Sequence, residues 1–258
     1  MKKVVVSVSV LVVGLVSGFL WKSTGNTQGA APASNVESVA RGGLLYDTWW
    51  RVVPSASEPK SDQALWSLQT TNKRKGSVTW RCKECHGWDY KGKDGAYGTG
   101  SRRTGFPGVW DAAQKKSVTE LSAILRGSAN PKHNFSSVLR SEDIADLANF
   151  LKSGLVDVMK YVDYKTKKPI GGDADRGKAQ YALCGACHGP DGKKLNFGDE
   201  KEPEYIGTLA KANPQEFLHK IRVGQSGSNP PMPAALVLGW DIKQVIDVLA
   251  YSQTLPEK

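Results

Sequence analysis

Sulfur and imidazole side chains are scarce in this chain, which holds only four Cys, four His and three Met in 258 residues. Four Cys are too few for a disulfide-dense mini-protein. Aromatic residues are also sparse, at 9%, whereas hydrophobic residues reach 40% and charged residues 23%. This balance excludes a disordered chain, a collagen-like chain and a membrane protein with several spans. The length fits one large domain or two domains of ordinary size.

Acidic residues are absent from the start of the chain, where Met-Lys-Lys precedes an apolar run over residues 4–21 that Lys22 closes. Such a run is either a cleaved export signal or a retained membrane anchor, and both are favoured over a buried core helix. No Cys follows the run directly, which excludes a lipid anchor there. The basic start predicts that the rest of the chain lies outside the cytoplasm.

We therefore predict a signal peptide or membrane anchor over residues 1–22 and a linker over residues 23–35, which are rich in Gly, Ala, Ser and Asn. The predicted localisation is periplasmic, or anchored to the inner membrane and facing the periplasm.

The four Cys form two pairs, and a histidine directly follows each pair. The two stretches are Cys82-Lys83-Glu84-Cys85-His86 and Cys184-Gly185-Ala186-Cys187-His188. Cys-x-x-Cys-His is typical of c-type haem attachment, in which both thiols form thioethers to one porphyrin and the histidine is the proximal iron ligand. A shared zinc site and structural disulfides are less favoured, because neither requires a histidine after each pair. A thioredoxin-type redox pair is less favoured because the βαβ context that it needs is absent. The sequence thus predicts two covalently bound haem c groups.

Three pieces of sequence recur around the Cys pairs, which indicates an internal repeat. An Arg-Gly-x-x-x-Tyr pattern occurs at residues 41–46 and again at 176–181, and residues 125–133 resemble residues 221–232. Each copy ends in an expected amphipathic helix. The two apolar stripes consist of Ile144, Leu147, Ala148 and Leu151, and of Val245, Val248, Leu249 and Ser252.

The copies differ in the distance from the tyrosine to the Cys pair. Tyr181 lies three residues before Cys184, whereas about thirty residues separate Trp50 from Cys82. We interpret the extra residues, roughly 52–79, as an inserted loop; an unrelated N-terminal helix is the alternative. The expected domains are therefore residues 36–155 and 172–258, joined by a connector over residues 156–171.

With these motifs, the sequence resembles the two-domain, dihaem class I cytochromes c. The second repeat follows the family pattern along its length, with Gly177 and Tyr181 in the first helix and Leu249 and Tyr251 in the last. In the first repeat the resemblance covers the attachment site and the final helix, and the insertion departs from it. The resemblance implies an all-α fold of two tandem domains, each wrapped around its haem.

The sixth iron ligands are expected from loops after the Cys pairs. The resemblance implies Met232, in Pro-Pro-Met-Pro, for haem 2, and Met159 is less favoured. His133 aligns with Met232 in the repeat, and residues 36–155 contain no Met, so His133 is expected for haem 1. We expect His219 to be a surface or propionate-contacting histidine rather than a ligand.

Two ligands on each iron leave no open site, so we expect an electron carrier rather than an enzyme. A low-potential bis-His haem 1 would pass electrons to a higher-potential His/Met haem 2, because a methionine ligand raises the potential. Two alternatives remain open: a dihaem redox enzyme of the peroxidase type, and a cytochrome subunit of a larger oxidoreductase.

The formal charge of +10 lies mostly in the leader and the first repeat. It favours an acidic redox protein as the partner, whereas nucleic acid is excluded by export. The docking surface that we expect joins four aromatic and four basic residues of the first repeat: Trp80, Trp88, Tyr90, Trp110, Lys91, Lys93, Arg102 and Arg103.

Overall fold

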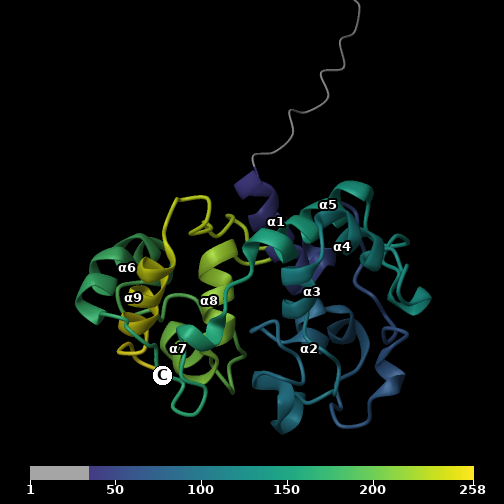
Figure 1. Ribbon diagram of the computed structural model, residues 1–258. Coiled ribbons are helices and arrows are strands. Elements are labelled where there is room, and N and C mark those ends of the chain that lie inside the picture. Colours follow the sequence, from purple (N-terminus) through teal and green to yellow (C-terminus); the bar gives the residue numbers. More distant parts are fainter. Residues whose placement is uncertain (1–34) are drawn as a thin grey trace, which may run out of the picture. The chain divides into compact units, whose positions relative to one another are not determined.

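The computed structural model describes residues 35–258, so the predicted signal or anchor and nearly all of the predicted linker lie outside the described residues. Residues 35–258 belong to one compact unit. Within residues 35–258 the secondary structure is helical and contains no strand (Figure 1), which agrees with the expected all-α class. None of these helices has the length and apolar character needed to cross a membrane.

The first half of the unit contains five α-helices separated by short 3-10 turns. The helices are α1 (Asn35–Thr48), α2 (Cys82–His86), α3 (Trp110–Lys115), α4 (Val118–Leu125) and α5 (Ser141–Asn149), which continues into the π-helical turn η7 (Phe150–Gly154). The turns are η1 (Trp49–Arg51), η2 (Trp66–Leu68), η3 (Gly76–Trp80), η4 (Ala96–Gly98), η5 (Gly100–Arg102), η6 (Pro131–His133) and η8 (Val158–Lys160). Between α1 and α2 the described chain forms only such turns, over the residues where an insertion is expected.

The second half contains four α-helices: α6 (Ala174–His188), α7 (Ile206–Ala212), α8 (Pro214–Val223) and α9 (Ile242–Ser252). Helix α6 packs on α9, as α1 packs on α5. Asp173 caps α6 and Asp241 caps α9, each accepting a hydrogen bond from a backbone amide three residues later. The helix starts therefore follow from local sequence.

A glycine lies at the close approach in both helix pairs. A Cβ added to Gly42 in α1 would lie 2.1 Å from the backbone oxygen of Asp146, and one added to Gly177 in α6 would lie 1.9 Å from that of Asp247. In each pair, the arginine before the glycine binds the aspartate whose backbone oxygen faces that glycine. Arg41 pairs with Asp146, and Arg176 Nε lies 2.8 Å from Asp247 Oδ2. The Arg-Gly pattern thus makes the same helix contact twice.

The tyrosine of each pattern also makes a matching contact. Tyr46 donates a hydrogen bond to the carbonyl oxygen of Gly87 (2.7 Å), and Tyr181 donates one to that of Gly189 (3.2 Å). Each of these glycines directly follows a Cys-x-x-Cys-His stretch. The tyrosines therefore tie α1 and α6 to the ends of the two attachment motifs.

The apolar stripes expected on the closing helices are buried. Ile144, Leu147, Ala148 and Leu151 are at most 5% exposed, and Val245, Val248, Leu249 and Ser252 at most 1%. All of these side chains except that of Ser252 belong to a hydrophobic core that continues across the two halves. Helix α1 also packs on α8. At that contact Gly43 lies so close to Val223 that an added Cβ would be 2.5 Å from a valine methyl group.

Candidate functional site

The first Cys pair lies on the short helix α2. Arg81, in an extended conformation, precedes the helix, and Gly87 ends it with a φ of 79°. Gly189 ends α6 after the second motif with a φ of 82°. This left-handed conformation is costly for residues with a Cβ, so the glycine after each histidine is required by the backbone. The chain turns away at once, and the motif histidine stays at the helix end.

One pocket brings the predicted ligands of the first site together. It holds about 410 Å³ of space between protein atoms, part of it open to solvent. Its lining consists of Gln63, Leu65, Thr79, Trp80, Arg81, Cys82, Cys85, His86, Phe106, His133 and Phe135. Cys82, Cys85 and His86 thus face the same space as His133, which is distant from them in the sequence.

The two histidines of this pocket have the separation that one metal ion would require. The ring centres of His86 and His133 are 6.2 Å apart. Metal–imidazole nitrogen bonds are about 2 Å long, so rings on opposite sides of one ion have centres roughly 6 Å apart. The separation of the ring centres is thus compatible with one iron bound by both imidazoles.

The proximal candidate His86 is held in one orientation. Its Nδ1 lies 2.7 Å from the carbonyl oxygen of Pro107. A carbonyl oxygen only accepts, so Nδ1 carries the hydrogen and Nε2 keeps its lone pair for a metal. Burial lowers the pKa of His86 to about 4, so the ring is neutral at pH 7 and able to bind iron.

His133 reaches the pocket from the turn η6. Asn130 holds this turn by accepting hydrogen bonds from the Lys132 amide (3.0 Å, side chain) and the His133 amide (2.8 Å, backbone). Burial lowers the pKa of the His133 imidazole. Its Nδ1 is buried and has no hydrogen-bond partner among the described residues. A neutral, incompletely satisfied imidazole beside half-buried thiols suits a metal ligand.

The thiols of the first pair are free and half-buried, and neither forms a disulfide in the structure. Desolvation is the main cause that raises the pKa of both Cys82 and Cys85 to about 12. In residues 35–258 no three or more His, Cys, Asp or Glu side chains gather as a metal site of their own, so the zinc site considered for the two Cys pairs gains no support.

Several pocket residues were missed by sequence reasoning. Gln63, Leu65 and Thr79 come from the expected insertion, and Phe106 lies in the loop before α3. Residues 52–79 show neither helical nor strand periodicity, so the sequence held no signal that this segment lines the pocket. Aromatic Trp80 was noticed, but as part of a docking surface.

The second predicted set is more open. Cys184 is half-buried and Cys187 is exposed at the end of α6. The ring of His188 lies 5.7 Å from that of Phe197, and its buried Nδ1 has no hydrogen-bond partner among the described residues. Burial lowers the pKa of this histidine. Met232 is half-buried against the core, and its amide donates to Ser228 Oγ (2.9 Å).

The expectation of a surface position for His219 is wrong, because this residue is only 1% exposed. Its Nε2 donates to the carbonyl oxygen of Gly43 (3.0 Å), and its Nδ1 therefore accepts from Tyr90 Oη (3.0 Å). Both ring nitrogens are thus used within the protein. The sequence pattern predicts that His219 lies in a helix, but it does not show that the face of α8 carrying this residue packs on α1.

The expected docking surface is also partly wrong, because Trp88 and Tyr90 are each 1% exposed. The Trp88 ring lies within 6 Å of three cations, those of Lys83 (5.3 Å), Lys220 (5.6 Å) and Arg81 (5.8 Å). The mixture of aromatic and basic residues here makes interior cation–π contacts rather than a binding face.

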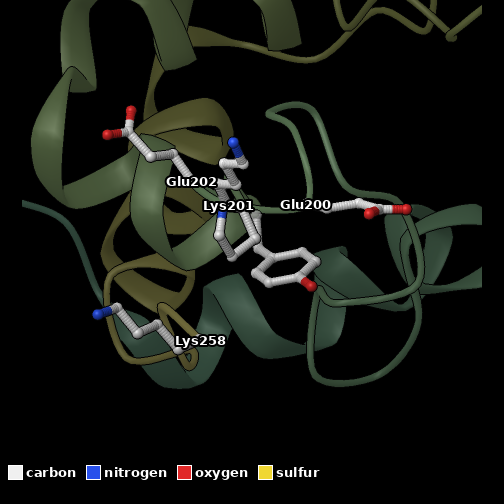
Figure 2. Close-up of a pocket in the computed structure, with 6 residues that line it drawn as sticks. Glu200, Lys201, Glu202 and Lys258 are labelled. Atoms are coloured by element: carbon white, nitrogen blue, oxygen red, sulfur yellow. The ribbon is translucent and has the colours of Figure 1, made fainter.

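A further depression lies at residues 200–205 and the C-terminus. It is lined by Glu200, Lys201, Glu202, Pro203, Tyr205 and Lys258. Figure 2 shows the charged ends of the labelled side chains pointing in different directions. None of the predicted iron ligands is among these residues, and the side chains do not converge on a common point.

Comparison with known protein families finds a match over part of the chain. Residues 74–154 match the family model described as cytochrome c, which covers the first motif and His133 but less than half of the chain. This match supports a c-type cytochrome with covalently bound haem c, a class of electron-transfer protein. Neither a curated protein nor a solved structure matches the chain.

Proposed function

We propose that this chain is a dihaem c-type cytochrome that relays single electrons between periplasmic or membrane redox partners. The observation that carries the proposal is the pocket in which Cys82, Cys85, His86 and His133 meet. Haem c bound there supplies one-electron iron chemistry whose potential depends on the axial ligands and their surroundings.

The residues of the first site have separate roles in this proposal. Cys82 and Cys85 hold the porphyrin through thioethers, and His86 is the proximal ligand that Pro107 orients. His133, whose ring centre lies 6.2 Å from that of His86, would be the distal ligand. With both histidines bound to the iron, substrates would be excluded from it and the site would be limited to electron transfer.

Matched contacts support a second haem domain over residues 172–258. Gly177 and Tyr181 make the same helix and motif contacts as Gly42 and Tyr46. Large apolar side chains near the second motif and Met232 are also 42–52% exposed, an arrangement that a porphyrin would cover. They are Leu183, Leu195, Phe197, Val237 and Leu238.

The proposed axial ligands predict that the two haems have different reduction potentials. His86 and His133 would make haem 1 the lower-potential centre, whereas Met232 opposite His188 would raise that of haem 2. Electrons would therefore pass from haem 1 to haem 2. The basic leader and first repeat, with an excess of Lys and Arg, favour an acidic donor or acceptor.

The proposal is tested on the full chain produced in cells that mature c-type cytochromes. Intact-mass measurement and haem quantification should find two covalent haems, and Cys184→Ser with Cys187→Ser should leave one. His133→Ala should turn only haem 1 high-spin by EPR, and Met232→Ala should remove the near-infrared methionine–iron band. Potentiometric titration of the unaltered protein should show two waves.

Three results would contradict the proposal. A single haem in the unaltered chain would exclude the dihaem assignment, and no covalent haem would exclude a cytochrome altogether. A ferric high-spin signal, or carbon monoxide binding by the reduced protein at neutral pH, would favour the dihaem enzyme instead. Co-purification with a catalytic subunit would identify a subunit of a larger oxidoreductase.

A further inference from the structure

The segment between α1 and α2 crosses the first site instead of forming a detached loop. Gln63, Leu65 and Thr79 contribute directly to the pocket lining. Gln63 is 7% exposed and Thr79 is 1% exposed, so both polar side chains are enclosed. A buried polar side chain persists where its hydrogen bonds are satisfied, and the partners of Gln63 therefore indicate what it does.

Gln63 joins this segment to the turn that carries His133. Its Nε2 donates to the carbonyl oxygen of Lys132 (2.8 Å), which precedes His133 directly. Its Oε1 accepts from the Leu65 amide (2.6 Å), and its backbone amide donates to Thr79 Oγ1 (2.9 Å). The side-chain nitrogen, the side-chain oxygen and the backbone amide of Gln63 thus all form hydrogen bonds. The bond to Lys132 links the segment to the turn η6, which carries His133.

The segment is also fastened at its other side. The Asn72 amide nitrogen Nδ2 donates to Glu84 Oε1 (3.0 Å), and Glu84, fully buried, lies between the two Cys of the first motif. Thr71 Oγ1 donates to the Arg103 carbonyl oxygen (2.6 Å). Residues 63–79 are therefore tied both to the helix that holds the thiols and to the turn that holds the distal imidazole.

The His133 ring packs against Phe135, with the ring centres 5.1 Å apart, and a backbone hydrogen bond at Ile124 also acts on it. Its position depends as well on where the turn η6 is placed, because this turn carries the residue. Asn130 fixes the turn from within, and the Phe135 amide fixes its far end by donating to Leu125 (2.9 Å). The bond from Gln63 is the contact that the insertion adds.

We propose that Gln63 is a positioning residue for His133, and that the segment 63–79 is a built-in clamp that keeps the distal imidazole on the iron of the first site. This inference rests on the proposed function, because it requires haem at Cys82 and Cys85. Loosening the clamp raises the fraction of time that His133 is displaced, and an external ligand then gains access to the iron.

The test compares two glutamine-to-glutamate variants of the full, haem-loaded chain. Gln63→Glu keeps the acceptor for Leu65 and loses the donor to Lys132. Gln114→Glu is the matched control, because Gln114 is an exposed glutamine of α3 that lies outside the segment. The probe is cyanide added to the ferric protein, and its binding rate at haem 1 is measured by absorbance and EPR.

We expect Gln63→Glu to accelerate cyanide binding roughly three- to tenfold, the effect of losing one buried hydrogen bond, and to add a high-spin component at haem 1. Gln114→Glu should stay within about twofold of the unaltered protein. His133→Ala sets the upper limit of the rate. Should Gln63→Glu fold poorly, Thr79→Val, which removes the bond to the Gln63 amide, should show a smaller acceleration.

The possible failures are distinguishable. If Gln63→Glu behaves as the unaltered protein does while His133→Ala binds cyanide faster, the clamp is wrong and the proposed function stands. If His133→Ala is also unchanged, His133 is not the distal ligand, and the inference falls with that assignment. If Cys82 and Cys85 carry no haem, both the proposed function and the inference are wrong.

Discussion

A single carboxylate, that of Asp47, organises the charges at the end of α1. It is 2% exposed and pairs with Arg81 and with Lys220 (3.4 Å), while Ser226 Oγ donates to it (3.2 Å). Burial alone would raise the pKa of Asp47, but Lys220 and Arg81 hold it well below its usual range. This residue therefore contributes to stability as an anion bound by two cations from different halves.

We predict that Asp47→Asn lowers the free energy of unfolding by about 2–3 kcal/mol at pH 7, because two partly buried cations lose their counter-ion. The carboxyl pKa is lower in the folded state, so the stabilisation is present above about pH 4 and is lost as the pH falls below it. Urea titrations at pH 7 and pH 3 should show the difference from the unaltered protein shrinking. Asp111→Asn, at an exposed site, is the control.

At the scale of elements, the contact of α6 with α9 depends on the absence of a side chain at Gly177. An added Cβ would meet the Asp247 carbonyl oxygen at 1.9 Å, and this backbone atom cannot turn away. The equivalent contact of α1 with α5 depends on Gly42 in the same way. Helix pairing in both halves is thus set by one glycine each.

Gly177→Ala should lower the free energy of unfolding by about 1–3 kcal/mol, since the helices must separate to admit the methyl group. Gly185 lies in the same helix with its nearest neighbour 3.8 Å from an added Cβ. Gly185→Ala should therefore be neutral or stabilising by roughly 0.5–1 kcal/mol, because it removes chain flexibility in a helix. Thermal unfolding of the two variants gives the comparison, and equal losses would refute this account.

The helices and the attachment motifs could be predicted from the sequence, because both have short-range signatures. The stripe of Ile144 and Leu147 and that of Val245 and Val248 follow the helical period, and each is buried as expected. The path of residues 52–79 could not be predicted, because Gln63 reaches its partner Lys132 across 69 positions of sequence. Long-range hydrogen bonds of aperiodic segments leave no local pattern.

At the scale of the whole molecule, the two halves share a core, and a histidine lies within it. His219 of α8 bonds to Gly43 of α1 and to Tyr90, next to the first motif, and the ring of Phe150 lies 5.7 Å away. Burial lowers the pKa of His219 to about 3. Sequence reasoning missed this arrangement because it considered each repeat separately, and the contact exists only between them.

We therefore predict that acid lowers the free energy of unfolding through the protonation of His219. The unfolded chain protonates His219 near pH 6.5 and the folded chain does so only near pH 3, so stability falls as the pH drops through this range. At pH 5 the cost from this residue is about 2 kcal/mol. His219→Gln should lose less stability between pH 7 and pH 5 than the unaltered protein in urea titrations; equal losses would show that His219 does not control the junction.

The desolvation of the first thiol pair has a consequence for how the protein is made. With pKa values raised to about 12, Cys82 and Cys85 are almost entirely protonated at neutral pH in the closed fold. Thiols react as thiolates, and desolvation in this fold lowers the thiolate fraction of both residues. If haem is attached as proposed, the thiols would therefore react more readily before the pocket has closed around them.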